Sequence, residues 1–352
     1  MRNLAAPKGD RRFGRKLTRV GIHPDGLTLT PEGTAMQSIL DLGADVDSRY
    51  IWVACAAHSF APYRIDNTRN AILVWLRTLP RGSRLGMEST ATYHELLANL
   101  AHKAGLQVFV ANSRDVRRYA QGVGCRGKTD RISAEVIARY VAREHADLHA
   151  YVPPTKEQLA LKQLLKRRAK LTVTKAALTQ SLRGLPGAGR EIKRLMTGID
   201  ELIAHIDRLS ERTLQKLTSA REAAEHIRTI AGFGALSSAY LGYSFTRHPF
   251  SNSDSVVAFS GLDPRAEDSG KKHGRRRLSK RGPSEERRIL FNCARSASRT
   301  KVWRPYYQAQ RAKGLSATAA TVILARKMLR VAFALYKHKQ PFDPALLAVG
   351  TA

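Results

Sequence analysis

The sequence has little cysteine and no long apolar run. Only three of its 352 residues are cysteines, and Cys55, Cys125 and Cys293 are widely separated, with no CxxC pair. An odd, scattered set argues against a disulfide framework and a structural zinc knuckle, and it fits a reducing compartment. No apolar run approaches the ~20 residues that a bilayer span needs, and the N-terminus lacks a secretory apolar stretch. We therefore expect a cytoplasmic protein with no membrane partner.

Acidic residues are also scarce. The chain has 29 Asp and Glu against 60 Lys and Arg, a formal net charge of +31. A folded domain with this imbalance repels itself unless a polyanion neutralises it, so DNA or RNA is the expected partner. A merely basic or ribosome-associated protein is the alternative. Charge alone does not separate an enzyme from a packaging protein.

Pattern and composition divide the chain into four segments. Residues 1–38 are rich in Arg, Lys, Gly and Pro and predict a flexible basic arm. Residues 39–154 alternate strand and helix patterns, which predicts an α/β layer structure. Residues 155–228 are helical in pattern, and residues 229–345 are mainly helical, with Gly-rich turns and one strongly basic segment. The expected strands of the second segment cover 39–46, 50–58, 83–88 and 106–111.

The third segment has a leucine repeat typical of a short coiled coil. Leucines recur every seven residues, with two more at the companion heptad position: Leu164, Leu171, Leu178 and Leu185, with Leu161 and Leu182. Gly184, Pro186, Gly187 and Gly189 predict a break before a second helix over 192–217. We predict a dimerising helical hairpin. A helix packed within its own domain is the alternative.

Three acidic residues of the α/β segment stand where a metal site is commonly built. Asp45 and Glu88 end apolar strands, and Asp130 opens a helix. Two-metal phosphoryl chemistry needs several carboxylates that converge on ions about 4 Å apart, and Mg²⁺ prefers oxygen ligands. Taken singly, each acid is better explained as a solvated turn residue or a helix N-cap, whereas the three together in this order are far more specific.

A serine of the last segment stands in a basic setting. Ser269 precedes Gly270, which permits a tight turn. Cations follow at Lys271, Lys272, Arg275, Arg276, Arg277, Lys280 and Arg281. A serine that attacks DNA needs cations to hold the scissile phosphate. On chemistry alone, a loop that grips phosphate, with Ser269 donating only a hydrogen bond, is the better interpretation.

These motifs together resemble the DEDD insertion-sequence transposases, which are relatives of the Piv-type DNA invertases and include the bridge-RNA-guided recombinases. The resemblance runs through Gly43-Ala44-Asp45-Val46, Glu88-Ser89-Thr90-Ala91-Thr92-Tyr93, Lys128-Thr129-Asp130-Arg131-Ile132-Ser133-Ala134, Phe259-Ser260-Gly261-Leu262-Asp263-Pro264, Ser269-Gly270 and Leu278-Ser279-Lys280-Arg281-Gly282. It implies a RuvC-like (ribonuclease H-type) domain that binds Mg²⁺ through Asp45, Glu88 and Asp130. It also implies that Ser269 is the nucleophile.

One position departs from the family pattern. The family carries a second aspartate three residues after Asp130, whereas this chain has Ser133. Residues three apart share a helical face, so the pattern suits paired ligands, and serine brings no charge. Glu135 lies about 140° round the helix from Asp130 and does not easily substitute. The resemblance therefore leaves the fourth ligand missing.

The implied function is a transposase that joins donor and target DNA through a phosphoserine intermediate, as a homodimer or homotetramer guided by a structured bridge RNA. A nucleoid-associated bacterial location follows. Two alternatives stay open. One is a RuvC-like structure-specific nuclease in which metal-activated water attacks. The other is a non-catalytic nucleic-acid-binding regulator, which Ser133 makes more credible.

Overall fold

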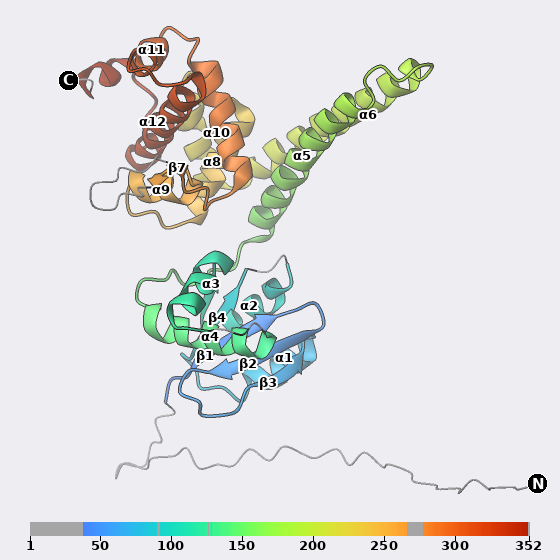
Figure 1. The fold of residues 1–352 in the computed structure, drawn as a ribbon, viewed down its shortest axis with the longest axis vertical. Coiled ribbons are helices and arrows are strands. Elements are labelled where there is room, and N and C mark those ends of the chain that lie inside the picture. Colours follow the sequence, from blue (N-terminus) through green and yellow to red (C-terminus); the bar gives the residue numbers. More distant parts are fainter. Residues whose placement is uncertain (1–37, 90–91, 126, 128, 266–276, 351–352) are drawn as a thin grey trace, which may run out of the picture. The chain divides into compact units, whose positions relative to one another are not determined.

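The computed structural model describes residues 38–89, 92–125, 127, 129–265 and 277–350. All but the last residue of the predicted basic arm therefore lies outside the described residues. The chain divides into two compact units between Pro153 and Pro154. The first contains a sheet with helices and the second is almost entirely helical (Figure 1), so the predicted α/β region followed by a helical region is confirmed.

The first unit is built on a five-stranded mixed sheet in the order β3-β2-β1-β4-β5. The strands are β1 (Asp41–Val46), β2 (Tyr50–Cys55), β3 (Tyr63–Asp66), β4 (Arg84–Glu88) and β5 (Gln107–Ala111). The first three strands pair antiparallel, whereas β4 runs parallel to both β1 and β5. The mixed directions follow from the connections, since β1 and β2 are joined by a tight turn and β4 and β5 by a helix.

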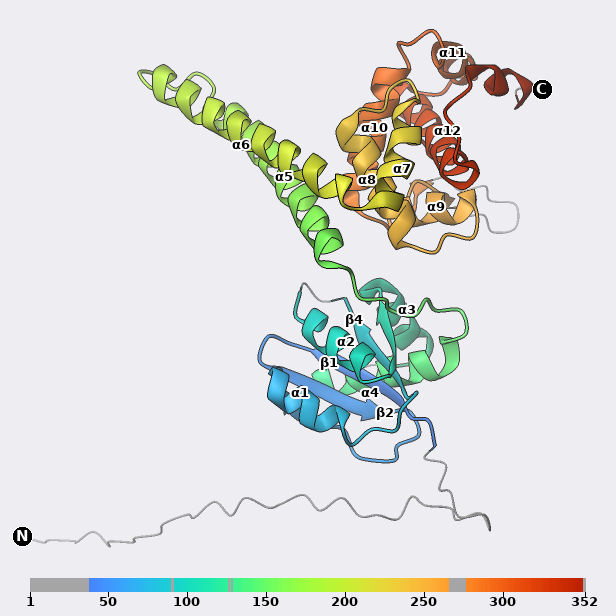
Figure 2. The same cartoon turned by 180° about the vertical axis from the view of Figure 1, so that it is seen from behind.

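Helices cover both faces of this sheet. Alternate strand side chains such as Leu42, Ala44 and Met87 pack with α1 (Arg69–Leu76) and α2 (His94–Lys103). The opposite face is covered by α4 (Asp130–Glu144), with α3 (Ser113–Gly122) beside it. Figures 1 and 2 show these two layers from opposite sides. Two glycines, Gly43 and Gly86, face α4.

The backbone of α4 lies directly against β1. A Cβ atom on Gly43 would be 2.1 Å from the Ala134 carbonyl oxygen and 2.3 Å from the Ala138 amide nitrogen. A Cβ on Gly86 would be 2.3 Å from a methyl carbon of Val141. Side chains on these two strand positions are therefore incompatible with the observed distance between helix and sheet.

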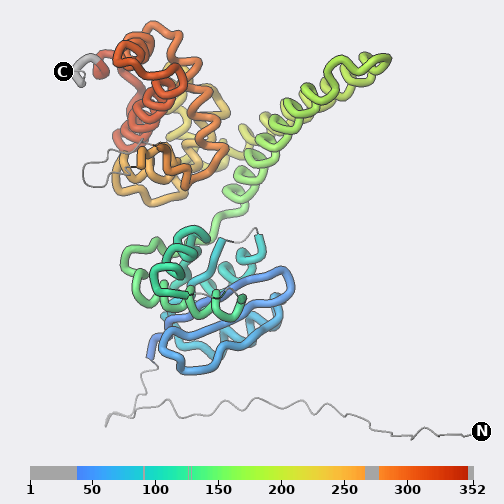
Figure 3. Tube along the Cα trace, in the orientation of Figure 1, coloured from blue at the N-terminus to red at the C-terminus, as the bar shows by residue number. Residues whose placement is uncertain are grey.

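The second unit begins with an antiparallel hairpin of two long helices, α5 (Lys156–Ser181) and α6 (Gly189–Gln215) (Figure 3). The helices are separated where the glycines and Pro186 predicted a break. Leu161 and Leu165 are the buried leucines of α5, whereas Leu185 is 52% exposed. The repeat therefore does not form a uniformly buried seam within this chain. Dimerisation through the hairpin stays a prediction.

The rest of the second unit is a helical bundle. Its elements are α7 (Thr218–Arg228), α8 (Ala235–Arg247), α9 (Ser253–Ser260), β6 (Pro264–Arg265), β7 (Arg277–Leu278), α10 (Ser284–Ala297), α11 (Arg304–Ala312), α12 (Ala317–His338) and a final 3-10 helix (Pro344–Gly350). The core surrounds α12 and includes the fully buried Trp303. No helix among the described residues is both long enough and apolar enough to cross a bilayer.

One carboxylate lies inside this bundle. Glu286 of α10 is 1% exposed, and neither carboxylate oxygen accepts a hydrogen bond of standard geometry from a described residue. Burial raises the pKa of Glu286 from 4.5 to about 8, against the opposing influence of Arg287 and the Ser244 hydroxyl. The protein therefore folds around a protonated side chain at pH 7, which an apolar setting tolerates better than a charge.

The raised pKa predicts a pH-dependent stability that Glu286→Gln removes. Between pH 4.5 and 8 the unfolded chain releases this proton and the folded chain keeps it, so the free energy of unfolding falls as pH rises. The difference of 3.5 pKa units sets an upper bound on the order of 5 kcal/mol. In denaturant titrations at pH 5 and pH 8, the free energy of unfolding of Glu286→Gln should rise relative to that of the wild type as pH rises. Glu222→Gln, which removes an exposed carboxylate of α7, should keep the wild-type dependence; identical pH dependence for Glu286→Gln would contradict this explanation.

The contact between α4 and β1 predicts opposite effects for one substitution at two glycines. Gly43→Ala should lower the free energy of unfolding by about 1–3 kcal/mol or more, because the new methyl group meets helix backbone that cannot rotate away. Gly198→Ala in α6 meets nothing within 4 Å and should be neutral or stabilising by up to about 1 kcal/mol. Thermal unfolding measures both. A Gly43→Ala protein as stable as the wild type would show that α4 does not pack this closely.

Candidate active site

Asp45 and Glu88 lie on neighbouring parallel strands. The register of β1 and β4 pairs Gly43 with Gly86 and Ala44 with Met87, so the next pair along is Asp45 beside Glu88. Adjacent strands are about 4.8 Å apart, and residues two apart on a strand share a face. Both acids therefore emerge on the face of Gly43 and Gly86, which α4 covers. Both are half-buried.

Contacts at the opposite end of the strands fix the direction of α4. Arg84, the first residue of β4, donates a 3.0 Å hydrogen bond from Nη2 to Oδ2 of Asp41, the first residue of β1. Its other Nη also contacts the ring of His145, which caps the C-terminus of α4. The C-terminal end of α4 thus lies where the two strands begin. Its N-terminal end, with Asp130, is directed toward the end where Asp45 and Glu88 lie.

Asp130 is held at a helix start whose sequence explains its position. The preceding residue, Thr129, is the N-cap, and its hydroxyl accepts a 3.3 Å hydrogen bond from the Ile132 amide. Asp130 itself is exposed, in the first turn of α4, where the helix dipole favours a negative charge. The dipole alone is a sufficient reason for an acid at this position, so the geometry does not by itself assign Asp130 a catalytic role.

Ser133, which stands where the family has a second aspartate, lies about one helical turn after Asp130 in α4. Ser133 is half-buried, and its amide donates to the Thr129 carbonyl at 2.8 Å as part of the helix. Glu135 forms an ion pair of 3.6 Å with Arg131. Glu135 is therefore paired with a cation of its own helix.

The carboxylates match the ligand preference of a hard divalent cation without forming a closed cage. Asp45 and Glu88 offer adjacent oxygen donors, the ligand type that Mg²⁺ prefers. Among the described residues, no group of three or more His, Cys, Asp and Glu is close enough to hold one ion. The candidate site is thus a pair of acids on the strands with a third acid on the facing helix.

The segment that carries the predicted nucleophile lies outside the described residues. This applies to Ser269 and to four of the predicted phosphate-binding residues, Lys271, Lys272, Arg275 and Arg276. Both flanks are described, and they pair as a two-residue antiparallel ladder: β6 with β7, Pro264 opposite Leu278 and Arg265 opposite Arg277. Residues 266–276 thus stand between the two paired strands in the sequence.

The base of this hairpin is fixed by hydrogen bonds between its two flanks. The Ser279 hydroxyl donates to the Asp263 carboxylate, and the Ser279 amide donates to the Asp263 carbonyl at 3.0 Å. Next to it, the Lys280 amide donates to the Gly261 carbonyl at 3.1 Å. The hydroxyl and the amide of Ser279 therefore both join the two flanks through Asp263.

Two glycines and one arginine complete the base of the hairpin. We call Gly261, Asp263, Ser279, Gly282 and Arg287 together the platform. Gly261 has a φ of +70°, and a Cβ on Gly282 would be 1.7 Å from the Phe259 carbonyl oxygen. Arg287 of α10 donates from Nη1 to the carbonyls of Ser260 at 3.1 Å and Gly282 at 2.6 Å. The role of Arg287 was not predicted from the sequence, because nothing in its local pattern marks it as a bridge between two loops.

The described cations of the hairpin are on its surface. Arg277, Lys280 and Arg281, three of the predicted phosphate-binding residues, are exposed, and so is Arg265, which was not predicted. Arg265 pairs with Arg277 across the ladder, so two like charges are directly opposite each other. Such a pair is destabilising by itself and is relieved by an anion.

Family profiles match both units. A profile described as a DEDD transposase of IS110 type matches residues 42–185 and so spans the three acids. A second, described as the IS116/IS110/IS902 transposase family, matches residues 224–308 and spans Ser269 with its platform.

Similar proteins have related descriptions. The pilin gene-inverting protein of Moraxella bovis is 26% identical over 270 residues, which cover 73% of this chain and 81% of that protein. The transposase for insertion sequence element IS1328 of Yersinia enterocolitica is 26% identical over 289 residues, which cover 74% of this chain and 84% of that protein. The chain belongs to the IS110/IS116/IS902 family of DEDD insertion-sequence transposases.

Proposed function

We propose that this protein is a DNA transposase that cuts and rejoins strands through a phosphoserine bond at Ser269. The observation that carries the proposal is the placement of Asp45 beside Glu88, with the N-terminus of α4 directed toward them. The matched family, the inverting and transposing relatives and the net charge of +31 support DNA as the substrate. The mixed sheet with acids at its strand ends supports the RuvC-like fold expected for such an enzyme.

The chemistry conserves phosphoester bonds. The Ser269 oxygen would form a bond to the DNA phosphorus while one P–O ester bond of the backbone breaks, and the hydroxyl proton ends on the released deoxyribose oxygen. A second deoxyribose hydroxyl then reverses the exchange on a new strand and frees the serine. Because one ester replaces another in each step, rejoining requires no external energy source.

The proposed metal ligands are Asp45, Glu88 and Asp130. Mg²⁺ bound there would neutralise phosphate charge and favour ionisation of a hydroxyl. The exposed Arg277, Lys280 and Arg281 would hold the DNA backbone at the base of the hairpin. We propose that the two units act together within one chain or between protomers of a dimer or tetramer, and that a structured bridge RNA selects donor and target DNA, as the family resemblance implies.

Ser269→Ala tests the nucleophile. The variant should form no covalent protein–DNA adduct, because alanine has no oxygen to bond to phosphorus, while its affinity for DNA stays near that of the wild type. Denaturing gels with end-labelled DNA measure the adduct. Ser284→Ala removes an exposed serine at the start of α10 and should leave the adduct unchanged. An adduct on Ser269→Ala would refute the assignment, and hydrolysed 5′-phosphate ends without attached protein would instead support a metal-dependent nuclease.

Ser133→Asp tests whether the missing aspartate limits activity. The substitution places a carboxylate one turn after Asp130 on the same side of α4, where it adds an acidic ligand. We expect adduct formation in Mg²⁺ to rise by about tenfold or more, which corresponds to about 1.4 kcal/mol of barrier. Ser133→Asn is the matched control of similar size without the charge. Absence of activity in the wild type and in Ser133→Asp would favour the non-catalytic regulator.

A further inference from the structure

The two helices of the α5–α6 hairpin differ sharply in charge. Helix α5 has seven Lys and Arg and one acid, Glu157, near its start. Helix α6 has five Lys and Arg and five Asp and Glu. The two helices are nearly equal in length, 26 and 27 residues, so the difference is one of composition. The net positive charge of the hairpin is therefore concentrated on α5.

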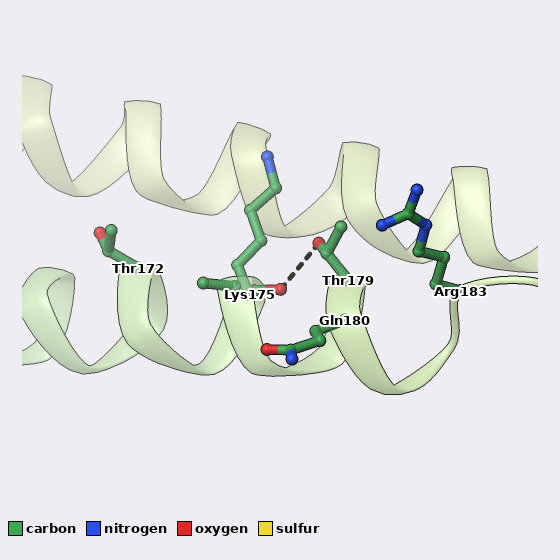
Figure 4. Close-up of a pocket in the computed structure, with 6 residues that line it drawn as sticks. Thr172, Lys175, Thr179, Gln180 and Arg183 are labelled. Carbon is green, nitrogen blue, oxygen red and sulfur yellow. Dashed lines mark hydrogen bonds between the residues drawn. The ribbon is translucent and has the colours of Figure 1, made fainter.

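Two of the α5 cations are neutralised within the hairpin. Arg168 forms a two-point contact with Asp207 of α6, from Nε to Oδ1 at 2.5 Å and from Nη2 to Oδ2 at 3.2 Å. Lys175 forms an ion pair with Asp200 of α6. Figure 4 shows the Lys175 side chain extending toward the neighbouring helix. These pairs hold the helices together and use charges that face inward.

Four further cations of α5 lie on its outer side. Lys162, Lys166, Arg167 and Lys170 are exposed, and none forms an ion pair with a described residue. The three lysines are spaced by four residues, so they form one row with about 6 Å between successive positions.

The row is attached to a rigid base. Leu161 and Leu165, each adjacent in sequence to a lysine of the row, are buried in a cluster with residues of α6, α7 and α8. A turn of about 100° per residue places these leucines on a different side of α5 from the lysines. The lysines are therefore presented by a helix that is fixed in the core of its unit.

We propose that this outer side of α5, defined by Lys162, Lys166, Arg167 and Lys170, binds the phosphate backbone of a nucleic-acid duplex. A row of regularly spaced cations without acids among them matches a regular array of phosphates and reads no bases. A solvated helix face usually mixes both signs, as α6 does. A membrane surface is a poorer fit, because an interfacial helix needs a continuous exposed apolar stripe, and Val173 is the one large apolar α5 side chain that is more than half exposed.

This surface serves the substrate class of the proposed function but does not depend on Ser269 or on the carboxylates. Its test is therefore a binding measurement that requires no strand breakage. If Ser269 formed no adduct, the binding measurement on α5 would still be valid. If the α5 variant bound DNA and RNA like the wild type, the evidence from the adduct assay would be unchanged.

The experiment compares two triple variants of the full chain. Lys162→Gln, Lys166→Gln and Lys170→Gln together remove the row. Arg208→Gln, Arg212→Gln and Lys216→Gln together remove three exposed cations with the same spacing at the end of α6, among acids such as Asp207 and Glu211. Glutamine has a helix propensity close to that of Lys and Arg, so both variants should keep their helices, which circular dichroism checks.

Affinity for a 30-base-pair duplex is measured against salt concentration. The α5 variant should bind at least tenfold more weakly at low salt, and the slope of log K against log[salt] should be shallower by up to about 3, from about 0.9 for each lost phosphate contact. The α6 variant should keep the wild-type slope. A DNA duplex and an RNA duplex of the same sequence form separate arms, and the duplex that shows the difference identifies which nucleic acid α5 contacts. An unchanged slope for the α5 variant with both duplexes, or an equal loss in both triple variants, would overturn the proposal.

Discussion

The close contact between α4 and the strands that carry Gly43 and Gly86 is the constraint on which the first unit depends. Without side chains at these two positions, the helix backbone approaches the sheet to a distance that no larger residue permits. The Arg84 contacts with Asp41 and His145 then set the direction of the helix. Together these interactions direct the N-terminus of α4 toward the strand ends where Asp45 and Glu88 emerge, so the candidate site is a consequence of how the core packs.

The platform in the second unit follows the same physical logic. Gly261 and Gly282 permit two loops to touch at backbone distance, and Arg287 bonds to a carbonyl of each. A segment that connects β6 and β7 therefore starts and ends at fixed points. Fixed flanks of this kind would suit the role proposed for Ser269, because catalysis depends on holding a reacting group in a narrow range of positions.

The sequence predicted elements better than it predicted contacts. The strands around Leu42 and Leu85 were found because buried parallel strands are continuous apolar runs. The edge strand β3 was missed, since Tyr63–Asp66 is mostly exposed and lacks an alternating pattern. The sequence positions of the three acids identified them as candidates. The adjacency of Asp45 and Glu88, however, depends on strand register, which local composition does not encode. The role of Ser269 came from family resemblance alone, because on chemistry alone a serine among cations is better explained as a hydrogen-bond donor in a phosphate-binding segment.

The net charge calculated from the sequence counts all cations alike. The structure distinguishes cations that pair with groups of the protein from cations that face solvent. Arg84, Arg168 and Arg287 face carboxylates or carbonyls and hold elements together. Lys162, Lys166 and Lys170 face solvent and hold nothing in the described part of the chain. A cation of the first kind stabilises the fold in any solvent, whereas unpaired cations at close spacing repel one another until a polyanion arrives. The excess charge that matters for binding is therefore the unpaired portion. On the helical hairpin, α5 carries seven cations and one acid, whereas the cations of α6 are interspersed with five acids.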